Sequence, residues 1–285
     1  MPYSDSGFAA LLLWCPKTPS VHSVIADFFA EREIALNELI IHSDLDMCFV
    51  RAVWARGENW DEVADFESEF GESALMLKAD FSVKLSQDAP SVGVFCSEQI
   101  YVLNDFLNKI DDPYYPAFEV SFICSSSDDC RKVADRFGIP FFYVSASTGN
   151  ADIQQKQIDI LQRYEPDWLV MPCCDTLLGV TVIAAANCPI LSLQSSFLPS
   201  LKSEKAYEMA YDQGLKCLGA TARLVESKKP GPIVTQDYIT LAPCPSAAIV
   251  QDSGHEIERK VFANGFRKLV EHKVIVYNAK TIVFD

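Results

Sequence analysis

The sequence predicts an α/β protein in two parts: a small α+β domain, then a doubly wound, mostly parallel sheet. Over the first 85 residues, stretches of strand and helix length follow in the order β-α-β-β-α. From residue 92 onward, near-continuous apolar runs of four to seven residues alternate with helical segments, which is typical of parallel strands buried on both faces. The polar stretch "SQDAPS" at 86–91 predicts a linker. We therefore expect domains at 1–85 and 92–285.

The first part follows the pattern of a ferredoxin-like domain. Its expected strands are 8–14, 34–44 and 47–55, and its expected helices are 20–32 and 59–74. Val21, Ile25 and Phe28 share one side of the first helix, and Asn59 opens the second, acidic one. With 15 acidic and 6 basic residues through position 85, this part carries much of the negative charge.

The second part alternates strands and helices. Its expected strands are 92–96, 118–124, 140–146, 167–173 and 189–193, with helices at 98–110, 128–137, 153–164 and 176–186. After them we expect a helix at 204–213, strands at 215–225 and 233–242, a long helix at 246–271 and a hairpin at 274–284. Ligands of doubly wound sheets bind at the carboxyl ends of the strands. The small polar residues that follow "PILSL" therefore fall where a site is expected.

Composition excludes some classes of partner. A net charge of −15 argues against nucleic acids and anionic membranes, which would repel the chain. No apolar stretch reaches spanning length, and no basic segment precedes the first apolar run, so a cytoplasmic location is expected. The 10 cysteines lie mostly in apolar runs without C-x-x-C spacing, which favours buried free thiols. The four histidines lack partners at ligand spacing, and no metal site is expected.

Three blocks of the sequence are specific. They are "SSFLPSLKSEKAYEMAYDQGLKCLGATARLVESKKPGPIVTQD", "GIPFFYV" upstream of it and "ERKVFANGFRKLVEHKVIVYNAKTIVF" downstream. Together they resemble the formyltetrahydrofolate deformylase family of the folate-dependent formyltransferase superfamily. The resemblance covers nearly the whole chain, and it implies an ACT-type regulatory domain at the N-terminus, where Cys15-Pro16 matches a family motif. It also implies that the second part has the formyltransferase fold.

The resemblance implies removal or transfer of the formyl group of 10-formyltetrahydrofolate. In the family an Asn and a His polarise the formyl oxygen, and an Asp orders the attacking water. Such a division of labour is needed because an amide carbon is attacked readily only when the oxyanion is stabilised and water is activated. This chain departs at each position: Ser192 and Gln194 replace the Asn and His, Arg223 replaces a nearby His, and Lys229 (or Lys228) stands in the region of the Asp.

Other family motifs are altered as well, while the scaffold blocks remain. The Ser-Lys-x-x-His-Cys-Leu motif reads "SEQIYVL" at 97–103, and the Ser-Asn-His turn reads "SSS" at 125–127. The Pro-Asp-x-x-Gly ligand turn reads "PKTPS" at 16–20, without its glycine. Random decay would be expected to damage the scaffold too. We therefore expect a retained but altered role, with little of the ancestral deformylase activity.

The candidate site combines two sets of residues. Expected catalytic residues are Ser192, Gln194, Ser195 and Lys229. Expected substrate-binding residues are Cys173, Cys174, Asp175, Arg223, Gly231 and Pro232. A cysteine or serine beside Lys229 could act as a nucleophile, and Arg223 with the loop lysines could hold an anion. Core packing, turn capping and solvated lysines are the structural alternatives, and Gly231 is expected to supply a positive φ before a strand.

Three functions remain open. The first is a repurposed enzyme acting on a folate-like or other small formyl- or amide-bearing molecule. The second is a non-catalytic protein that binds a ligand or a partner, and the third is a residual deformylase that uses Gln194 and bound water. A tetrahydrofolate derivative is the ligand that the resemblance implies. A homo-oligomer, dimer or tetramer, is expected through the N-terminal domain, whose strands can extend a neighbouring sheet.

Overall fold

The computed structural model describes residues 7–56, 63–86, 89–97, 100–144, 150–172, 178–194, 206–226, 230–242 and 246–285. Two compact units make up the chain. The first consists of Met1–Asp88 with Val270–Tyr277 and Ile282–Asp285, and the second of Ala89–Leu269 with Asn278–Thr281. Of the helices in the described ranges, none combines the length and apolar character needed to cross a membrane.

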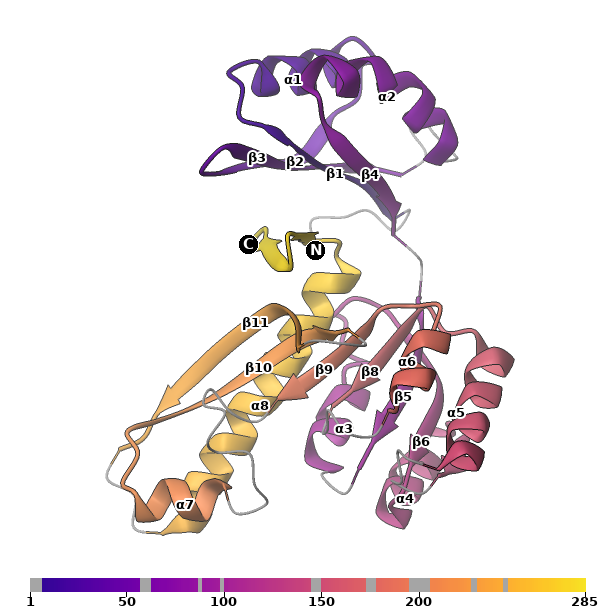
Figure 1. The fold of residues 1–285 in the computed structure, drawn as a ribbon, viewed down its shortest axis with the longest axis vertical. Coiled ribbons are helices and arrows are strands. Elements are labelled where there is room, and N and C mark those ends of the chain that lie inside the picture. The colour runs from indigo at the N-terminus through magenta and orange to yellow at the C-terminus, as the bar shows by residue number, and fades with distance from the viewer. Residues whose placement is uncertain are drawn as a thin grey trace. The chain divides into compact units, whose positions relative to one another are not determined.

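The first unit is built on a four-stranded antiparallel sheet (Figure 1). Its strands are β1 (Phe8–Pro16), β2 (Leu36–Asp44), β3 (Met47–Ala55) and β4 (Asp80–Leu85), and its helices are α1 (Val21–Ala30) and α2 (Val63–Leu77). The strand order is β2-β3-β1-β4, the split βαβ arrangement of ferredoxin-like domains. Strand β4, which was not predicted from the sequence, completes the sheet at one edge.

Both faces of this sheet are covered. On one face, Leu11 and Leu13 of β1 belong to a buried cluster with Phe28 of α1 and Phe66 of α2. On the other face, Leu12 and Phe49 pack against Ile275 and Phe284 near the C-terminus of the chain. Ile275 lies in β12 (Val274–Tyr277), and Phe284 directly follows β13 (Lys280–Val283), the second strand of the same hairpin. The hairpin was expected, but its apolar partners lie more than 200 residues earlier in the chain.

The second unit contains a seven-stranded, mostly parallel sheet in the order β11-β10-β9-β8-β5-β6-β7 (Figure 1). Its strands are β5 (Ser91–Cys96), β6 (Glu119–Ser125), β7 (Phe141–Tyr143), β8 (Trp168–Met171), β9 (Ile190–Gln194), β10 (Cys217–Val225) and β11 (Pro230–Thr240). Its helices are α3 (Ile100–Leu107), α4 (Asp128–Phe137), α5 (Ala151–Tyr164), α6 (Val180–Ala185), α7 (Ala206–Asp212) and α8 (Ala247–Val270). The strands β5 to β9 are parallel, and β10 and β11 are antiparallel additions. This confirms the predicted α/β fold.

Helices cover this sheet on both sides. Helices α5 and α6 share an apolar cluster with alternate residues of β6 and β8 and with one residue each of β5 and β9, the latter being Ile190. Helix α8 packs on the opposite face, where Leu191 and Ala222 point. A Cβ atom on Gly265 of α8 would lie 2.8 Å from the Cβ of Ala222. Glycine therefore lets the long helix approach the sheet closely at this point.

Candidate functional site

The expected site residues Ser192 and Gln194 lie near the carboxyl end of β9. They share a face with Ile190, because side chains two residues apart in a strand point the same way. The neighbouring strand β10 places Arg223 directly opposite Ser192, and Thr221 directly opposite Gln194. Opposed residues in an antiparallel pair share a face. These four side chains therefore form one polar row across two strands, on the face away from α8.

Burial differs along this polar row. Ser192 and Thr221 are buried, whereas Gln194 and Arg223 are only partly buried. The side-chain amide of Gln236, on β11, donates a hydrogen bond to Oγ1 of Thr221 at 2.9 Å. The Nε atom of Arg223 is itself buried, yet it has no hydrogen-bond partner among the described residues. Buried donors in native proteins are nearly always paired, so an unpaired one calls for an explanation.

The chemistry of the polar row follows from its donors. The amide of Gln194, the guanidinium of Arg223 and two hydroxyl groups can all donate hydrogen bonds to an oxyanion or an anionic group. The amide and the two hydroxyl groups are not bases near neutral pH, and a guanidinium has donors but no acceptor. The row can therefore stabilise developing negative charge, but it cannot by itself remove a proton from water.

The register also locates Gly231 and Pro232, two expected substrate-binding residues. Strand β10 pairs with β11 through Val225 and Pro230, four residues beyond Thr221. At about 3.3 Å per residue, this end of the hairpin lies about 13 Å from the level of Gln194, toward the amino end of β9. The described residues on either side of position 229 therefore lie beyond the Arg223 end of the polar row. The role of Gly231 and Pro232 in binding stays a prediction.

Gly231 is required for a reason other than the expected one. Its φ angle is not in the left-handed region, so the predicted positive φ is wrong. A Cβ atom there would lie 2.0 Å from the carbonyl oxygen of Leu224. Glycine is needed because the two strands of the hairpin approach closely, next to a shift in their register.

Several expected site residues lie outside the described residues. They are Cys173, Cys174, Asp175, Ser195, Lys228 and Lys229. Their roles stay predictions, including the pairing of a nucleophile with Lys229. Among the residues that the structure does describe, no three His, Cys, Asp or Glu side chains form a group able to hold a metal ion.

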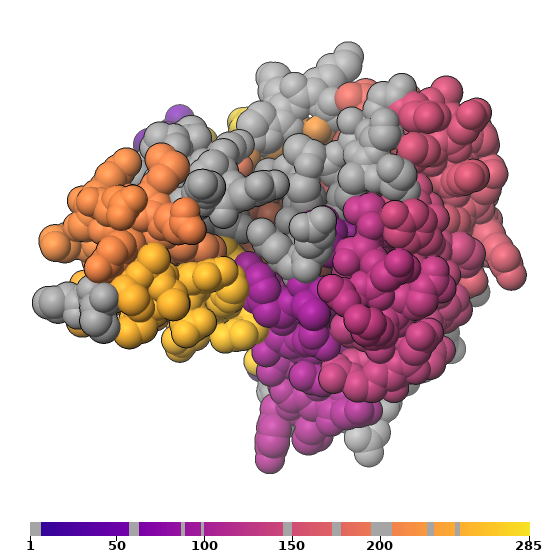
Figure 2. Space-filling view, turned by 90° about the horizontal axis from the view of Figure 1, so that it is seen from below, coloured from indigo at the N-terminus to yellow at the C-terminus, as the bar shows by residue number. Residues whose placement is uncertain are grey.

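A buried carboxylate that was not predicted from the sequence is Glu258 of α8. Its two oxygens accept hydrogen bonds from the hydroxyl groups of Tyr101 and Tyr207, on α3 and α7. Figure 2 shows α7 in orange beside α8 in yellow, and α3 in violet on the other side of α8. Helical spacing is the signal that could have found it, since Glu258 lies four residues after Gly254 and three before Val261, both buried.

This Glu258 network is a satisfied one. Burial, followed by the charge of Glu258, raises the pKa of Tyr207, so its phenol remains a donor at neutral pH. The ring of His255 stacks on Tyr101 with centroids 3.8 Å apart, and burial lowers the pKa of His255. A Cβ atom on Gly254 would lie 2.1 Å from the ring of Tyr207. These features indicate that the network fixes three helices against one another.

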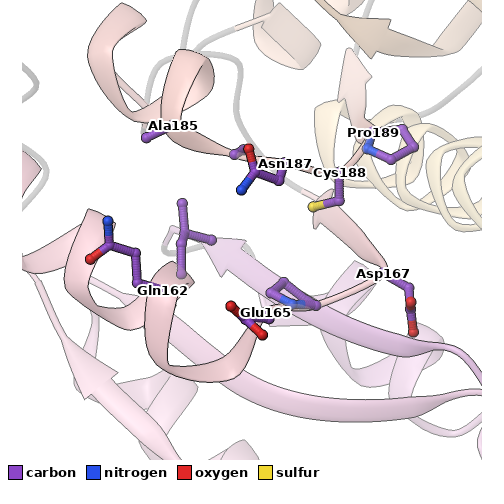
Figure 3. A pocket seen from close by; sticks show the side chains of 10 residues that line it. Gln162, Glu165, Asp167, Ala185, Asn187, Cys188 and Pro189 are labelled. Carbon is purple, nitrogen blue, oxygen red and sulfur yellow. The ribbon is translucent and has the colours of Figure 1, made fainter.

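A cavity of about 360 Å³ lies at the other edge of the sheet (Figure 3). It is lined by residues that end α5 and α6 and by those that lead into β8 and β9, such as Asp167 and Cys188. A carboxylate oxygen of Asp167 accepts the backbone N–H of Ser91 at 2.8 Å. Burial, with the charge of Asp167, raises the pKa of the Cys188 thiol to about 11. This cavity is therefore remote from the polar row and holds no activated nucleophile.

Known proteins resemble the chain over most of its length. It is 26% identical to a formyltetrahydrofolate deformylase of Bacillus subtilis, over 96% of this chain and 93% of that protein. It is 27% identical to the one from Synechocystis, over 97% and 98%. The crystal structure of a formyltetrahydrofolate deformylase from Pseudomonas syringae superposes with a TM-score of 0.86 at 23% identity, covering 98% of this chain and 94% of that one.

A more distant structure matches part of the chain. Glycinamide ribonucleotide transformylase 1 from Symbiobacterium toebii has a TM-score of 0.61 at 19% identity, covering 70% of this chain and 97% of its own. The sequence model of the formyl transferase family matches residues 91–265, which include β5 to β11 and most of α8. The resemblance inferred from the motifs is confirmed: the chain belongs to the formyl transferase family.

Proposed function

We propose that this protein is a divergent, formyltetrahydrofolate deformylase-like enzyme that acts on a folate-like or other small formyl- or amide-bearing molecule. The observation that carries the proposal is the buried, unpaired Nε of Arg223 beside Ser192 and Gln194. Leaving a buried donor without a partner costs about 1–3 kcal/mol. A ligand that brings a carbonyl oxygen or an anionic group to the polar row would remove that cost.

The same row supports weak deformylase activity. Loss of one acid or base residue typically lowers a rate by about 10²- to 10⁴-fold. Gln194 stands where the family resemblance implies a His, and an amide cannot exchange a proton near neutral pH. Stabilisation of the oxyanion would survive, whereas activation of water would depend on a group outside the row. Lys229 is the proposed candidate for that group, and it would act at the Arg223 end of the row, since Val225 pairs with Pro230 two residues beyond Arg223.

The decisive measurement is formate release from 10-formyltetrahydrofolate, with calorimetric binding of the same compound. We expect binding with turnover well below about 1 s⁻¹, the lower end for ordinary enzymes. Turnover in the usual range would instead support a functional deformylase. Binding with no turnover of any formyl or amide compound would support a ligand-binding protein without catalysis. Absence of binding would contradict the proposed folate-like ligand.

A gain-of-function variant sharpens this test. The double variant Ser192→Asn with Gln194→His restores the pair that the family resemblance implies, and formate release should rise by tenfold or more, within the range for one acid/base group. Gln236→His is the matched control, because it adds an imidazole one strand away, opposite Thr221. If the control raised turnover as much as the double variant, the assignment of the row would be wrong.

We further propose that the first unit is an ACT-type regulatory domain and that the protein is a homo-oligomer. The topology of the four-stranded sheet supports the first statement. Its outer strand β2 supports the second, because an edge strand can pair with a second copy. Size-exclusion chromatography with light scattering should give a multiple of the chain mass of 31.7 kDa. A species of that mass alone would contradict the oligomer.

A further inference from the structure

Two thiols meet at the carboxyl edge of the second unit's sheet. Cys96 is the last residue of β5, and Cys130 lies in the first turn of α4, the helix that follows β6 (Figure 1). Strands β5 and β6 are parallel neighbours, with Cys96 opposite Ser125. The sulfur atoms of Cys96 and Cys130 are 3.5 Å apart, close enough for a thiol–sulfur hydrogen bond. The fold thus holds two cysteines, 34 positions apart in sequence, in direct contact.

The surroundings of Cys130 favour its thiolate. The hydrogen bond from Cys96 lowers the pKa of Cys130 to about 7, with help from Ser125 and against the effect of burial and the charge of Asp129. Its position in the first turn of a ten-residue helix places it near the positive end of the helix dipole. In its thiol form it donates to the carbonyl oxygen of Ser97 at 3.1 Å. These contacts favour the nucleophilic thiolate form of Cys130.

A second pair of cysteines provides an internal contrast. Cys15 and Cys48 lie directly opposite each other on β1 and β3 of the first unit, and both are buried. Burial, together with the charge of Cys48, raises the pKa of Cys15 to about 11. The Cys48 sulfur also shares a hydrogen bond with the hydroxyl of Ser43, at 3.3 Å. Cys15 and Cys48 are thus close to each other, but the thiolate form of Cys15 is disfavoured.

Cys130 is buried but lies next to exposed residues in the chain. Both sulfur-bearing side chains are buried, but Asp128 and Asp129, which directly precede Cys130, are exposed. Ser97 and Ser127, on the two loops that flank the pair, are partly exposed. Cys130 thus directly follows solvent-exposed residues in the chain, and the test therefore uses a small oxidant, hydrogen peroxide.

We propose that Cys96 and Cys130 are a redox-active pair that closes to an intramolecular disulfide when the protein meets a peroxide. The Cys130 thiolate attacks one peroxide oxygen, the O–O bond breaks, and the departing hydroxide takes up a proton to become water. Cys96 then attacks the sulfur of the resulting sulfenic acid, its S–O bond breaks, and a second water leaves. The two thiols are oxidised to one disulfide and the peroxide is reduced. A dithiol reductant reverses the change.

The test uses the full-length protein treated with hydrogen peroxide under native conditions. Free thiols are then alkylated, and the peptides are identified by mass spectrometry with and without dithiothreitol. We expect a linked peptide that contains Cys96 and Cys130 and disappears on reduction. In Cys96→Ser, Cys130 should stop at the sulfenic acid, which dimedone traps. Cys130→Ser should lose both products, and Cys48→Ser, the matched control, should oxidise at 96 and 130 as the wild-type protein does.

The pH dependence provides a readout that needs no variant. With a pKa of about 7 for Cys130, the rate of disulfide formation should rise about tenfold from pH 6 to pH 8 and then level off, as the thiolate fraction does. A rate that still rises tenfold per pH unit up to pH 9 would overturn the proposal. So would equal oxidation of Cys15 and Cys48, or a linked peptide that forms only after denaturation. None of these readouts depends on deformylase activity, so this proposal and the proposed function can fail separately.

Discussion

Two arginines show how the same side chain serves different purposes in the two units. Arg51 of the first unit has no exposed surface, and its guanidinium donates to the carboxylate of Glu38 and to the carbonyl oxygens of Glu271 and His272. Arg223 of the second unit is only partly buried, and its Nε has no described partner. Each lies on a strand of its unit's central sheet. We call the Arg51 site closed, because protein acceptors bind its donors, and the Arg223 site open, because its Nε has no acceptor among the described residues.

The difference separates a structural group from a functional one. Burying a charge is tolerated when its donors are hydrogen-bonded. Arg51 meets that condition because it donates to the Glu38 carboxylate and to two backbone carbonyl groups. Arg223 does not meet it, so the missing acceptor has to come from elsewhere. The Glu258 network provides a second closed example, in the same unit as Arg223. The following predictions test whether closed and open sites respond differently.

The largest effect is expected for Arg51→Met. Removing the guanidinium leaves Glu38 and two carbonyl groups without their shared donor, and breaking a buried ion pair from one side costs about 3–5 kcal/mol. Urea unfolding should show this loss in the free energy of unfolding. Arg131→Met is the control, because Arg131 pairs with Asp128 on the surface of α4, where a pair contributes about 0–1 kcal/mol. Equal losses in the two variants would mean that the Arg51 site is not closed.

The second effect concerns His272, whose carbonyl oxygen Arg51 binds. Burial lowers the pKa of His272 to about 4; Lys84 and Arg51 add to this shift, and a backbone hydrogen bond with Leu85 opposes it. The folded pKa lies below the unfolded value of 6.5, so the folded state favours the neutral ring. Its contribution is present above pH 6.5 and is lost as the pH falls toward about 4. Glu38 and Glu271 are the acidic groups nearby.

The loss should amount to about 2–3 kcal/mol across that range, after allowance for partial exposure of the ring. Measuring the free energy of unfolding at intervals from pH 7 to pH 4 provides the check. His272→Asn is the control: asparagine tolerates the φ of 51° at this position and does not titrate. Its profile should be flatter by the same amount. Parallel profiles for both proteins would show that His272 is not held neutral.

Glu258→Gln should destabilise the second unit by about 2 kcal/mol. The amide keeps one acceptor oxygen, but its NH₂ group faces a phenol that needs an acceptor, and a buried donor left unpaired costs about 1–3 kcal/mol. Glu256→Gln, on the exposed side of α8, is the matched control and should change the free energy of unfolding by less than about 0.5 kcal/mol. Ligand affinity should be unchanged in both. A loss of affinity without a loss of stability would place Glu258 in a functional site instead.

Local patterns in the sequence predicted most of the elements but not their distant partners. Continuous apolar runs indicated β5, β6, β8 and β9, because both faces of a central parallel strand are buried. The missing strand β4 has six residues, of which only Val83 is buried, and it follows a helix closely, so its signal is weak. The contact of Phe284 with Phe49 depends on tertiary packing, which no local pattern contains.

Only the part of the candidate site that follows from the order of the parallel strands could be predicted from the sequence. The rule for parallel sheets placed Ser192 and Gln194 at the correct end of β9, but residues on β10 and β11 depend on register, which the sequence does not state. Thr221 was missed for that reason. A positive φ angle was predicted as the reason for glycine at position 231, whereas the actual reason is the close approach of two strands. Glu258 was not among the candidates, because its partners Tyr101 and Tyr207 lie on two other helices, far from it in the sequence.

The smallest effect on stability is expected for Arg223→Met, and it tests the open site directly. An unpaired buried donor contributes little to the folded state, so the free energy of unfolding should change by less than about 1 kcal/mol, or even rise. Binding of 10-formyltetrahydrofolate should weaken by about tenfold or more, since a hydrogen bond to a charged group contributes about 1.5–3 kcal/mol. Calorimetry and urea unfolding on the same preparation measure both quantities.

Arg223→Lys separates the geometry of the side chain from its charge. A lysine keeps the positive charge but lacks Nε and the planar fork, so it should recover little of the lost affinity if the open donor binds the ligand. Full recovery by lysine would mean that charge alone matters at this position. If Arg223→Met instead destabilised the protein as much as Arg51→Met and left binding unchanged, Arg223 would be structural, and the polar row would lose its one feature that calls for a ligand.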